Sequence, residues 1–359
     1  MTAPIRVASL RGDPASLGAV HGASFASEIR DYAADRVSLA AQGTDFTRDE
    51  LLDLASRCVP AHRSYSEPLT TEMEALAEAA GLTVAEALIV GGYTDFIDLV
   101  RAEAGTARVD DTCTAVIVPD SRAAGAGAGF LTQTWDMHAS ATPHIAMLDV
   151  RPDTGPGALV FTTVGCLGQI GMNEAGIAIG INNLTAADGR IGVTWPFVVR
   201  KVLAQTDFEA AMACIVDAPL AGGHNFLLFD AAGNGASIEA MPTATHVTRL
   251  EGEPLVHTNH CVAPVTSAVE GPRPEVLEES SRLRLAQATE LLGDGPVGVA
   301  EMMSLTRDER SICRHPTPPY SYESCGAAIM RPRTREFWAC WGVPSENEYE
   351  RFDLMGADV

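Results

Sequence analysis

The chain has 359 residues, and its 25 basic and 47 acidic side chains give a formal net charge of −22 at pH 7. This excess of negative charge disfavours a nucleic acid backbone or an anionic membrane surface as a partner. The length allows one large domain or two ordinary ones and is ample for a full hydrophobic core. We therefore expect a soluble protein that acts on small molecules.

The N-terminal residues lack the basic and apolar stretches of a secretion signal, and no apolar run is long enough to span a bilayer. These features predict a cytoplasmic protein. The cysteines form no Cys-x-x-Cys pair, and without a secretion signal reduced thiols are favoured over disulfides. We expect most of the cysteines to be structural. They stand at positions 58, 113, 166, 214, 261, 313, 325 and 340.

The first third of the chain has the pattern of a helical segment. Thr47 precedes Glu50, and Thr83 precedes Glu86, at the spacing of a capping box, in which a hydroxyl and a carboxylate satisfy free amides at a helix start. Two helices are therefore predicted to begin there. Residues 101–109 are small and show no periodicity, which predicts a connecting loop. Such a loop is a place where the chain could be cut.

From residue 113 onward, short apolar and β-branched segments alternate with turn signals, which predicts a strand-rich region. The glycine-rich residues 125–129 lack the spacing of a phosphate-binding loop and lead into a strand, so we expect a hairpin turn there. Two blocks of strands with helices between them predict stacked sheets covered by helices, an α+β architecture. The expected strands are 113–118, 130–135, 144–150, 158–164, 176–182, 224–229, 235–240, 245–249, 325–331 and 336–341, and the expected helices are 194–205, 207–217 and 274–293.

Cys113 lies at the start of the first predicted strand, because residues 114–118 are mostly apolar and Pro119 follows them. A single thiol in such a place is typical of a small buried hydrophobe. Several polar clusters, however, interrupt strands where burial would make polarity costly. Each cluster alone could simply hold a loop, but together with Cys113 they indicate a functional site. The clusters are residues 133–138, 173–176, 182–183, 224–225 and 257–261.

The order of these motifs resembles the peptidase C45 family, whose best-known member is acyl-coenzyme A:6-aminopenicillanic acid acyltransferase (isopenicillin N acyltransferase). That family belongs to the N-terminal-nucleophile (Ntn) hydrolases. The resemblance covers most of residues 113–330 and implies a four-layer αββα sandwich, in agreement with the layers predicted above. The matching features are Cys113-Thr114, Trp135-Asp136, residues 171–179 with Asn182, residues 257–261 and residues 311–314.

The resemblance implies a precursor that cleaves itself between Thr112 and Cys113. Residues 1–112 would form a helical small chain and residues 113–359 the Ntn catalytic core, the two remaining one globular unit. An α-amine has a pKa of about 7.7–8 and a thiol about 8.5, so the new terminal amine can act as the base for its own side chain. The expected substrate is a small N-acyl or aminoacyl amide, or an acyl thioester, that acylates Cys113. No cofactor is expected, and a homo-oligomer is compatible with the sequence.

Further roles follow from the resemblance alone. Asn259 matches the family's oxyanion-hole asparagine, a kind of donor typically worth ~10²–10³ in rate. Asp136 matches the aspartate that orients the amine and the nucleophile. The fungal acyltransferase has an arginine where Cys325 stands here, and the lost cation removes a charge that could hold Asp136 or activate Cys113. Either another cation substitutes, with Arg314 as the candidate, or this member of the family acts on different substrates. The candidate pocket residues are His21, Thr134, Trp135, Asn182, Ser324, Cys325 and Arg314.

Three alternatives stay open on sequence grounds. His257, His260 and Cys261 lie close together, but strand alternation turns His260 to the opposite face and no fourth ligand has a recognisable spacing, so a metal site is not expected. A thiol enzyme could work unprocessed, with His138 or His260 as its base. A non-catalytic binding protein could also keep the Ntn shell, because a shared fold does not imply a shared function.

Overall fold

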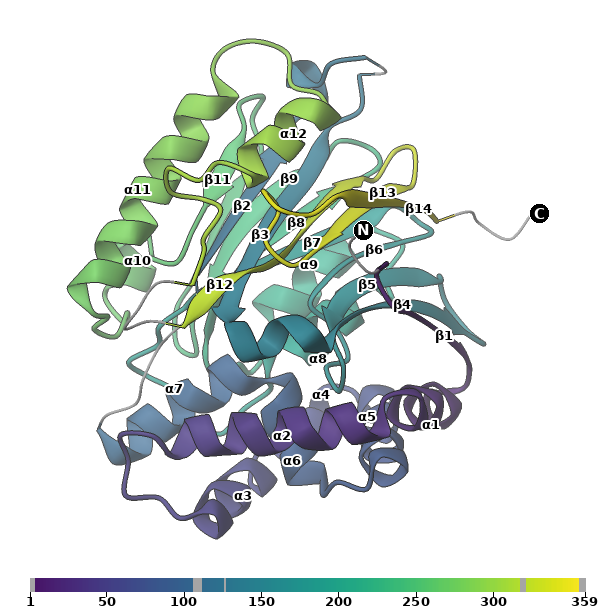
Figure 1. The fold of residues 1–359 in the computed structure, drawn as a ribbon, viewed down its shortest axis with the longest axis vertical. Helices are drawn as coiled ribbons and strands as arrows, with labels where there is room; N and C mark the ends of the chain where they lie inside the picture. Colours follow the sequence, from purple (N-terminus) through teal and green to yellow (C-terminus); the bar gives the residue numbers. More distant parts are fainter. Residues whose placement is uncertain (1–3, 106–111, 126, 317–320, 355–359) are drawn as a thin grey trace.

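The computed structural model describes residues 4–105, 112–125, 127–316 and 321–354. Two β-sheets lie face to face, with helices on the outer face of each (Figure 1). The facing surfaces are formed by β2 (Thr112–Val118) and β3 (Phe130–His138) on one side and by β7 (Ile177–Leu184) and β8 (Gly223–Asp230) on the other. The chain thus has the predicted α+β architecture, a four-layer αββα sandwich.

The larger sheet has eight strands, and its neighbours are antiparallel except at one edge, where β1 (Val7–Gly12) runs parallel to β4 (Ile145–Pro152). The pattern of the first third of the chain predicts helices alone, so strand β1 was not predicted. Its buried Ala8 and Leu10 alternate with exposed neighbours, which is the period-two pattern of a strand. Beyond β4 the order is β5 (Ala158–Thr163), β6 (Ile170–Asn173), β7, β8, β9 (Gly235–Ala240) and β10 (Thr245–Arg249).

The second sheet is antiparallel throughout. In β12 (Tyr322–Arg331) the register shifts between Ser324 and Gly326, so that Ser324 pairs with Asp136 of β3. Thr112 of β2 pairs with the same aspartate from the other side. Pairing within one sheet therefore gathers several candidate site residues at one end of the sandwich. In sheet order the strands are β11 (Leu255–His257), β2, β3, β12, β13 (Glu336–Trp341) and β14 (Tyr349–Asp353).

The outer helices cover both sheets (Figure 1). Helices α11 (Glu275–Leu292) and α12 (Val299–Thr306) pack on the second sheet, whereas α8 (Trp195–Val202) and α9 (Phe208–Val216) pack on the larger one. The short helix α10 (Pro264–Ser267) lies against β10. Each of the three helices predicted in this part of the chain is present, within a few residues of its expected ends.

The N-terminal helices form a layer across one end of the sandwich, drawn purple to blue in Figure 1. Both predicted capping boxes are present, because Thr47 and Thr83 accept the backbone N–H of Glu50 and Glu86, whose side chains accept in return. The helices are α1 (Pro14–Ser24), α2 (Ala26–Ala41), α3 (Arg48–Ser56), α4 (Val59–Tyr65), α5 (Glu67–Ala80), α6 (Val84–Gly91) and α7 (Tyr93–Ala104).

The loop expected over residues 101–109 begins later than predicted. Helix α7 continues through Arg101 and ends at Gly105, whose backbone is left-handed (φ 76°). An ion pair from Arg101 to Asp98, one turn earlier, stabilises this end of the helix. The remainder of the expected loop, residues 106–109, lies outside the described residues.

Most strands lie where the sequence predicts them. The antiparallel strands β2 and β3 are joined by residues 119–129, of which the predicted turn 125–129 is the second half; residue 126 lies outside the described part. Two 3₁₀ helices, Asp120–Arg122 and Ala139–His144, flank β3. Strands β6, β11 and β14 were not predicted. They are only four, three and five residues long, too short for periodicity to stand out.

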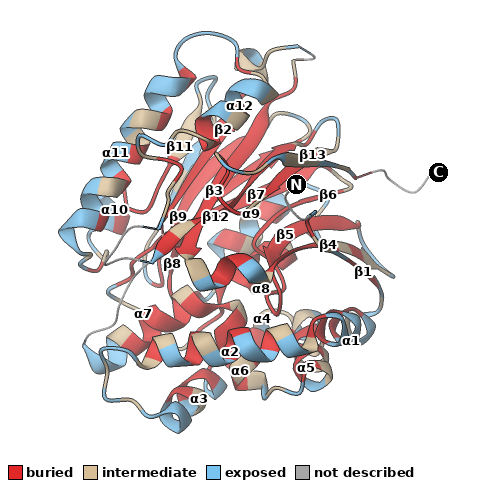
Figure 2. Cartoon of the chain, in the orientation of Figure 1, coloured by how far each residue is buried: buried red, intermediate tan, exposed pale blue. Residues whose placement is uncertain are grey.

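Burial follows the layers. The inner strands of both sheets are almost entirely buried, whereas the edge strands β1, β10 and β14 and the outer sides of the helices present exposed residues (Figure 2). The largest apolar cluster among the described residues contains side chains from both sheets and from the N-terminal helices. Among the described residues, no helix combines the length and the apolar character needed to cross a bilayer.

Glycine lets α1 and α5 pack backbone to backbone. A Cβ on Gly18 would meet the carbonyl oxygen of Glu72 inside van der Waals contact, and neither helix backbone can move aside easily. We predict that Gly18→Ala lowers the free energy of unfolding by about 1–3 kcal/mol, measured by urea denaturation. Gly295→Ala is the matched control, because nothing lies within 4 Å of its added Cβ. Equal losses in the two variants would contradict the packing explanation.

Candidate functional site

Cys113 is the second residue of β2, at the end of the sheet that meets the N-terminal helices. It is 2% exposed and lines a cavity of about 30 Å³, called here the Cys113 pocket. Both parts of the chain build this pocket. The N-terminal helices contribute Tyr32, Val90, Gly91, Tyr93 and Thr94, and the sandwich contributes residues that include Trp135, Asn183, Trp195 and His224.

Polar groups hold the main chain of Cys113 on both sides. Its nitrogen donates a hydrogen bond to Asn259 Oδ1 at 2.7 Å, and its carbonyl oxygen accepts one from Arg284 Nη1. Arg284 also donates to Asn259 Oδ1 at 2.9 Å and to Thr114 Oγ1 at 3.2 Å. The candidate nucleophile, the candidate asparagine and a buried cation therefore form one connected cluster.

The orientation of the Asn259 amide follows from its neighbours. Its oxygen accepts from two donors, Cys113 and Arg284, so the nitrogen points the other way and donates to the carbonyl oxygen of Asn183 at 3.0 Å. In this uncleaved chain the Asn259 nitrogen is thus occupied by the protein itself. The oxyanion role that the family resemblance implies for Asn259 stays a prediction.

The sequence analysis missed Arg284, which projects from α11 into the core. The residue is fully buried, and burial lowers the pKa of its guanidinium to about 10, against the opposing effect of the charges on Asp136 and Cys113. It is still a cation at neutral pH. A sequence signal existed, because Arg284 lies on the same helical stripe as the buried Leu277 and Ser281.

Asp136 is buried at the same end of the sheet and links three segments. It accepts hydrogen bonds from Thr112 Oγ1 at 2.7 Å and from Ser324 Oγ at 2.6 Å. Burial raises the pKa of this carboxyl, while the Arg284 charge and then the two hydroxyls favour its ionised form. Asp136 therefore fixes the residue that precedes the candidate nucleophile, and the hydroxyl of Ser324 donates to it from β12.

Neither Cys325 nor Arg314 supplies the main positive charge beside Asp136. Cys325 is buried against backbone carbonyls, and burial raises its pKa to about 12, so it carries no charge. Arg314 donates to Ser280 Oγ at 3.0 Å and acts on Asp136 more weakly than Arg284 does. The main cation beside Asp136 is Arg284, so the suggestion of Arg314 is corrected.

Of the candidate pocket residues, Trp135 is the one that lines the Cys113 pocket within the described part of the chain. Thr134 and Asn182 precede lining residues in their strands, so alternation turns them to the opposite face, and Asn183 takes the place expected of Asn182. His21 lies in α1, where a backbone N–H of the loop after β5 donates to its Nε2 at 3.1 Å. Burial lowers its pKa to about 3. Contrary to expectation, His21, Thr134 and Asn182 lie outside the pocket, and Ser324, Cys325 and Arg314 lie behind it near Asp136.

The histidine in the Cys113 pocket is His224 of β8. Neither His138 nor His260, the bases considered for an unprocessed enzyme, is among the described lining residues. His260 lies 2.7 Å from Ser281 Oγ through Nδ1, and burial lowers its pKa to about 4. The geometry therefore gives no support to His138 or His260 as the base of Cys113.

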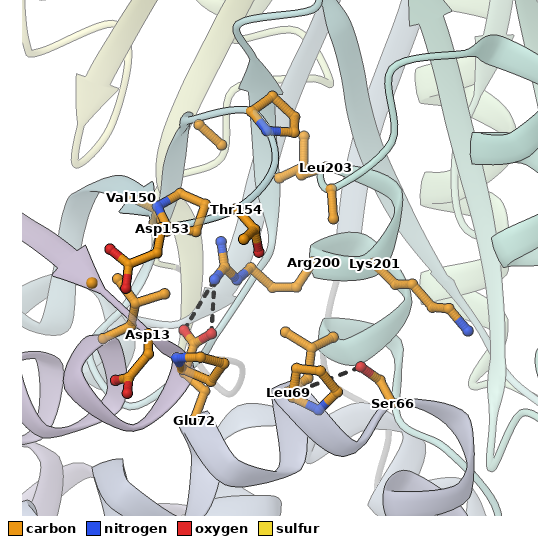
Figure 3. A pocket seen from close by; sticks show the side chains of 18 residues that line it. Asp13, Ser66, Leu69, Glu72, Val150, Asp153, Thr154, Arg200, Lys201 and Leu203 are labelled. Atoms are coloured by element: carbon orange, nitrogen blue, oxygen red, sulfur yellow. Dashed lines mark hydrogen bonds and ion pairs between the residues drawn. The ribbon is translucent and has the colours of Figure 1, made fainter.

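A larger cavity of about 480 Å³ lies between α1, α5, the end of β4 and α8 (Figure 3). Its walls are mainly apolar, and a buried ion pair joins Arg200 to Glu72 at 2.9 Å in its wall. Lys201 points away from this pair toward Tyr65, whose carbonyl oxygen its Nζ reaches at 2.9 Å. Neither a cysteine nor any candidate catalytic residue is among its described lining residues, so its size does not make it the reactive site.

Several known proteins are similar to this chain. The 40 kDa form of acyl-coenzyme A:6-aminopenicillanic-acid-acyltransferase from Emericella nidulans is 24% identical over 255 residues, which are 70% of this chain and 68% of that relative. A mutant of conjugated bile acid hydrolase from Clostridium perfringens is 10% identical with a TM-score of 0.46, covering 67% of this chain and 92% of the other. Penicillin V acylase from Agrobacterium tumefaciens is 13% identical with a TM-score of 0.38, covering 67% and 86%.

A family model gives the decisive match. The model of the acyl-coenzyme A:6-aminopenicillanic acid acyl-transferase family matches residues 123–346, more than half of the chain. The matched segment includes Asp136, Asn259 and Arg284 and begins after Cys113. The chain therefore belongs to the acyl-coenzyme A:6-aminopenicillanic acid acyl-transferase family and is an enzyme.

Proposed function

We propose that the chain cleaves itself between Thr112 and Cys113 and then acts as an N-terminal-cysteine amide hydrolase or acyltransferase. The observation that carries the proposal is the polar cradle of the Cys113 main chain, in which Asn259 accepts from the nitrogen and Arg284 donates to the carbonyl oxygen. A cysteine that only fills a core needs no such cradle. After cleavage, Asn259 would hold the new α-amine next to the thiol.

Self-cleavage begins when Cys113 Sγ attacks the carbonyl carbon of Thr112. The carbon–nitrogen bond breaks, the nitrogen takes up a proton, and the Thr112 acyl group moves to sulfur as a thioester. Water then hydrolyses the thioester to a carboxylate on Thr112 and a free thiol on Cys113. Asp136 supports this step because it holds Thr112 through its side-chain hydroxyl.

In the cleaved enzyme the α-amine of Cys113 accepts the thiol proton, since the ordinary pKa values of the two groups differ by less than about one unit. The thiolate attacks the substrate carbonyl, the leaving amine or thiol departs with a proton, and an acyl thioester remains on Cys113. Attack by water completes hydrolysis, and attack by a second amine completes acyl transfer. The expected substrates are small N-acyl or aminoacyl amides and acyl thioesters.

Arg284 provides the positive charge for this chemistry. It contacts the main chain of Cys113 and lies in a buried region, where a charge interacts with its neighbours more strongly than in water. A cation at that place favours the thiolate and the ionised form of Asp136. Arg284 thus takes over from the arginine that the family resemblance expects at Cys325.

Both products of the cleavage would stay in the active enzyme. Strand β1 is hydrogen-bonded to β4, and the N-terminal helices share the main apolar core with the sandwich. The same helices form one wall of the Cys113 pocket. The small chain is therefore expected to remain bound and to help define which substrates enter.

Self-cleavage can be tested by the masses of the fragments. Intact mass measurement under denaturing conditions should give two fragments that meet at Thr112 and Cys113, because the thiol is the attacking group. Cys113→Ala removes the nucleophile and should give one uncut chain. A single full-length chain from both proteins would contradict self-cleavage.

The effect of the Arg284 charge on the Cys113 thiol can be tested by its rate of alkylation. We expect Arg284→Met to slow alkylation of Cys113 by iodoacetamide at pH 7 by about tenfold or more, because an opposite charge nearby shifts an acid's pKa by ~1–3 units. Mass spectrometry of the modified peptide measures the rate.

Two matched variants separate charge from packing. Arg284→Lys keeps the cation and should recover part of the lost rate. Arg314→Met removes the cation that acts more weakly on Asp136 and should have a smaller effect. Alkylation of Arg284→Met at the rate of the parent protein would rule out Arg284 as the activating charge.

A further inference from the structure

Three elements bring Thr94 (α7), Trp195 (α8) and His224 (β8) together in the wall of the Cys113 pocket. Trp195 Nε1 donates a hydrogen bond to Thr94 Oγ1 at 3.0 Å, and the same oxygen lies 3.3 Å from His224 Nε2. Asp95, the neighbour of Thr94 in the chain, places Oδ1 at 2.9 Å from His224 Nδ1. These four residues are called here the Thr94 network, and all of them except Asp95 line the pocket.

The direction of the hydrogen bonds follows from Asp95. This carboxylate is fully buried, and its Oδ2 accepts the backbone N–H of Trp195 at 2.7 Å, which fixes its position. Asp95 Oδ1 faces His224 Nδ1 at 2.9 Å without regular hydrogen-bond alignment, and a carboxylate oxygen in this place favours the tautomer of His224 with its proton on Nδ1. Its Nε2 is then an acceptor and receives the hydroxyl proton of Thr94.

In this arrangement the hydroxyl oxygen of Thr94 can accept one further hydrogen bond. Its proton is donated to His224, and one lone pair accepts from Trp195. Within the described part of the chain no other donor reaches this oxygen, so its second lone pair remains available in a residue that lines the pocket. An acceptor in a largely apolar cavity costs free energy when it has no partner, so the site is complementary to a ligand that carries a hydrogen-bond donor.

We propose that Thr94 determines specificity by accepting a hydrogen bond from a hydroxyl or amino group on the acyl part of the substrate. This inference rests on the proposed acylation of Cys113, which keeps the acyl group in the pocket while the leaving group departs. The pocket volume of about 30 Å³ has room for about two water-sized groups. The donor therefore belongs on the carbon next to the reacting carbonyl, which makes 2-hydroxyacyl and 2-aminoacyl groups the preferred class. His224 is a positioning residue that acts through Thr94.

The test compares two substrates that differ by one hydroxyl group. The cleaved enzyme is assayed with the 2-hydroxypropanoyl and propanoyl thioesters of the same small thiol, each enantiomer of the first separately, and thiol release gives kcat/KM. We expect one 2-hydroxypropanoyl enantiomer to be preferred by about tenfold or more, the factor that one hydrogen bond in a buried site supplies.

Two variants of Thr94 assign the preference to its hydroxyl. Thr94→Ser keeps the hydroxyl and should keep the preference. Thr94→Val has nearly the same shape without the hydroxyl and should bring the ratio of the two kcat/KM values close to one. Intact mass measurement confirms that each variant is cleaved and folded enough to be compared.

The possible failures are distinct. Turnover of both thioesters without a preference, or a preference that survives in Thr94→Val, would overturn the role of Thr94 and leave the proposed function standing. If neither thioester releases thiol and neither adds mass to the large chain, the proposed function is overturned and the Thr94 inference with it.

Discussion

The buried guanidinium of Arg284 is the interaction on which the site depends. Removing an arginine from water costs several kcal/mol unless its donors and its charge find partners. Here its donors reach the Cys113 carbonyl, Thr114 and Asn259, and the charge of Asp136 lies nearby. These partners come from β2, from the loop after β11 and from β3, so satisfying one cation brings three segments into register around the candidate nucleophile.

The second constraint is the wall that the N-terminal helices supply. In the intact chain α2, α6 and α7 close the Cys113 end of the sheet with Tyr32, Val90 and Thr94. The same segment enters the larger sheet through β1. Cleavage before Cys113 would thus free the amine without releasing the wall, because the two parts share one core. Chemistry from the large chain and selectivity from the small chain fit together in this arrangement.

Much of the architecture was predictable, because the signals that specify it are local. The capping boxes at Thr47 and Thr83 satisfy amides within one helical turn. The apolar runs of β2 and β12 are long enough for a strand pattern to stand out in the sequence. Strand β6 spans only Ile170–Asn173, and pairing with its neighbours rather than its own pattern makes it a strand. The same holds for β11.

The residue pattern by itself determined stacked sheets covered by helices and the place of Cys113 at a strand start, since both depend on spacing along the sequence. The resemblance of the ordered motifs to a known family implied the αββα arrangement of these layers. Strand alternation in the sequence also places Trp135 and Thr134 on opposite faces of one strand, and Asn183 and Asn182 on opposite faces of another. Only the tertiary structure decided that Arg284 is the cation and that Thr94, Trp195 and His224 meet in one pocket. These contacts join residues as much as 171 positions apart, and such distances are closed by packing of whole elements, which no local pattern records.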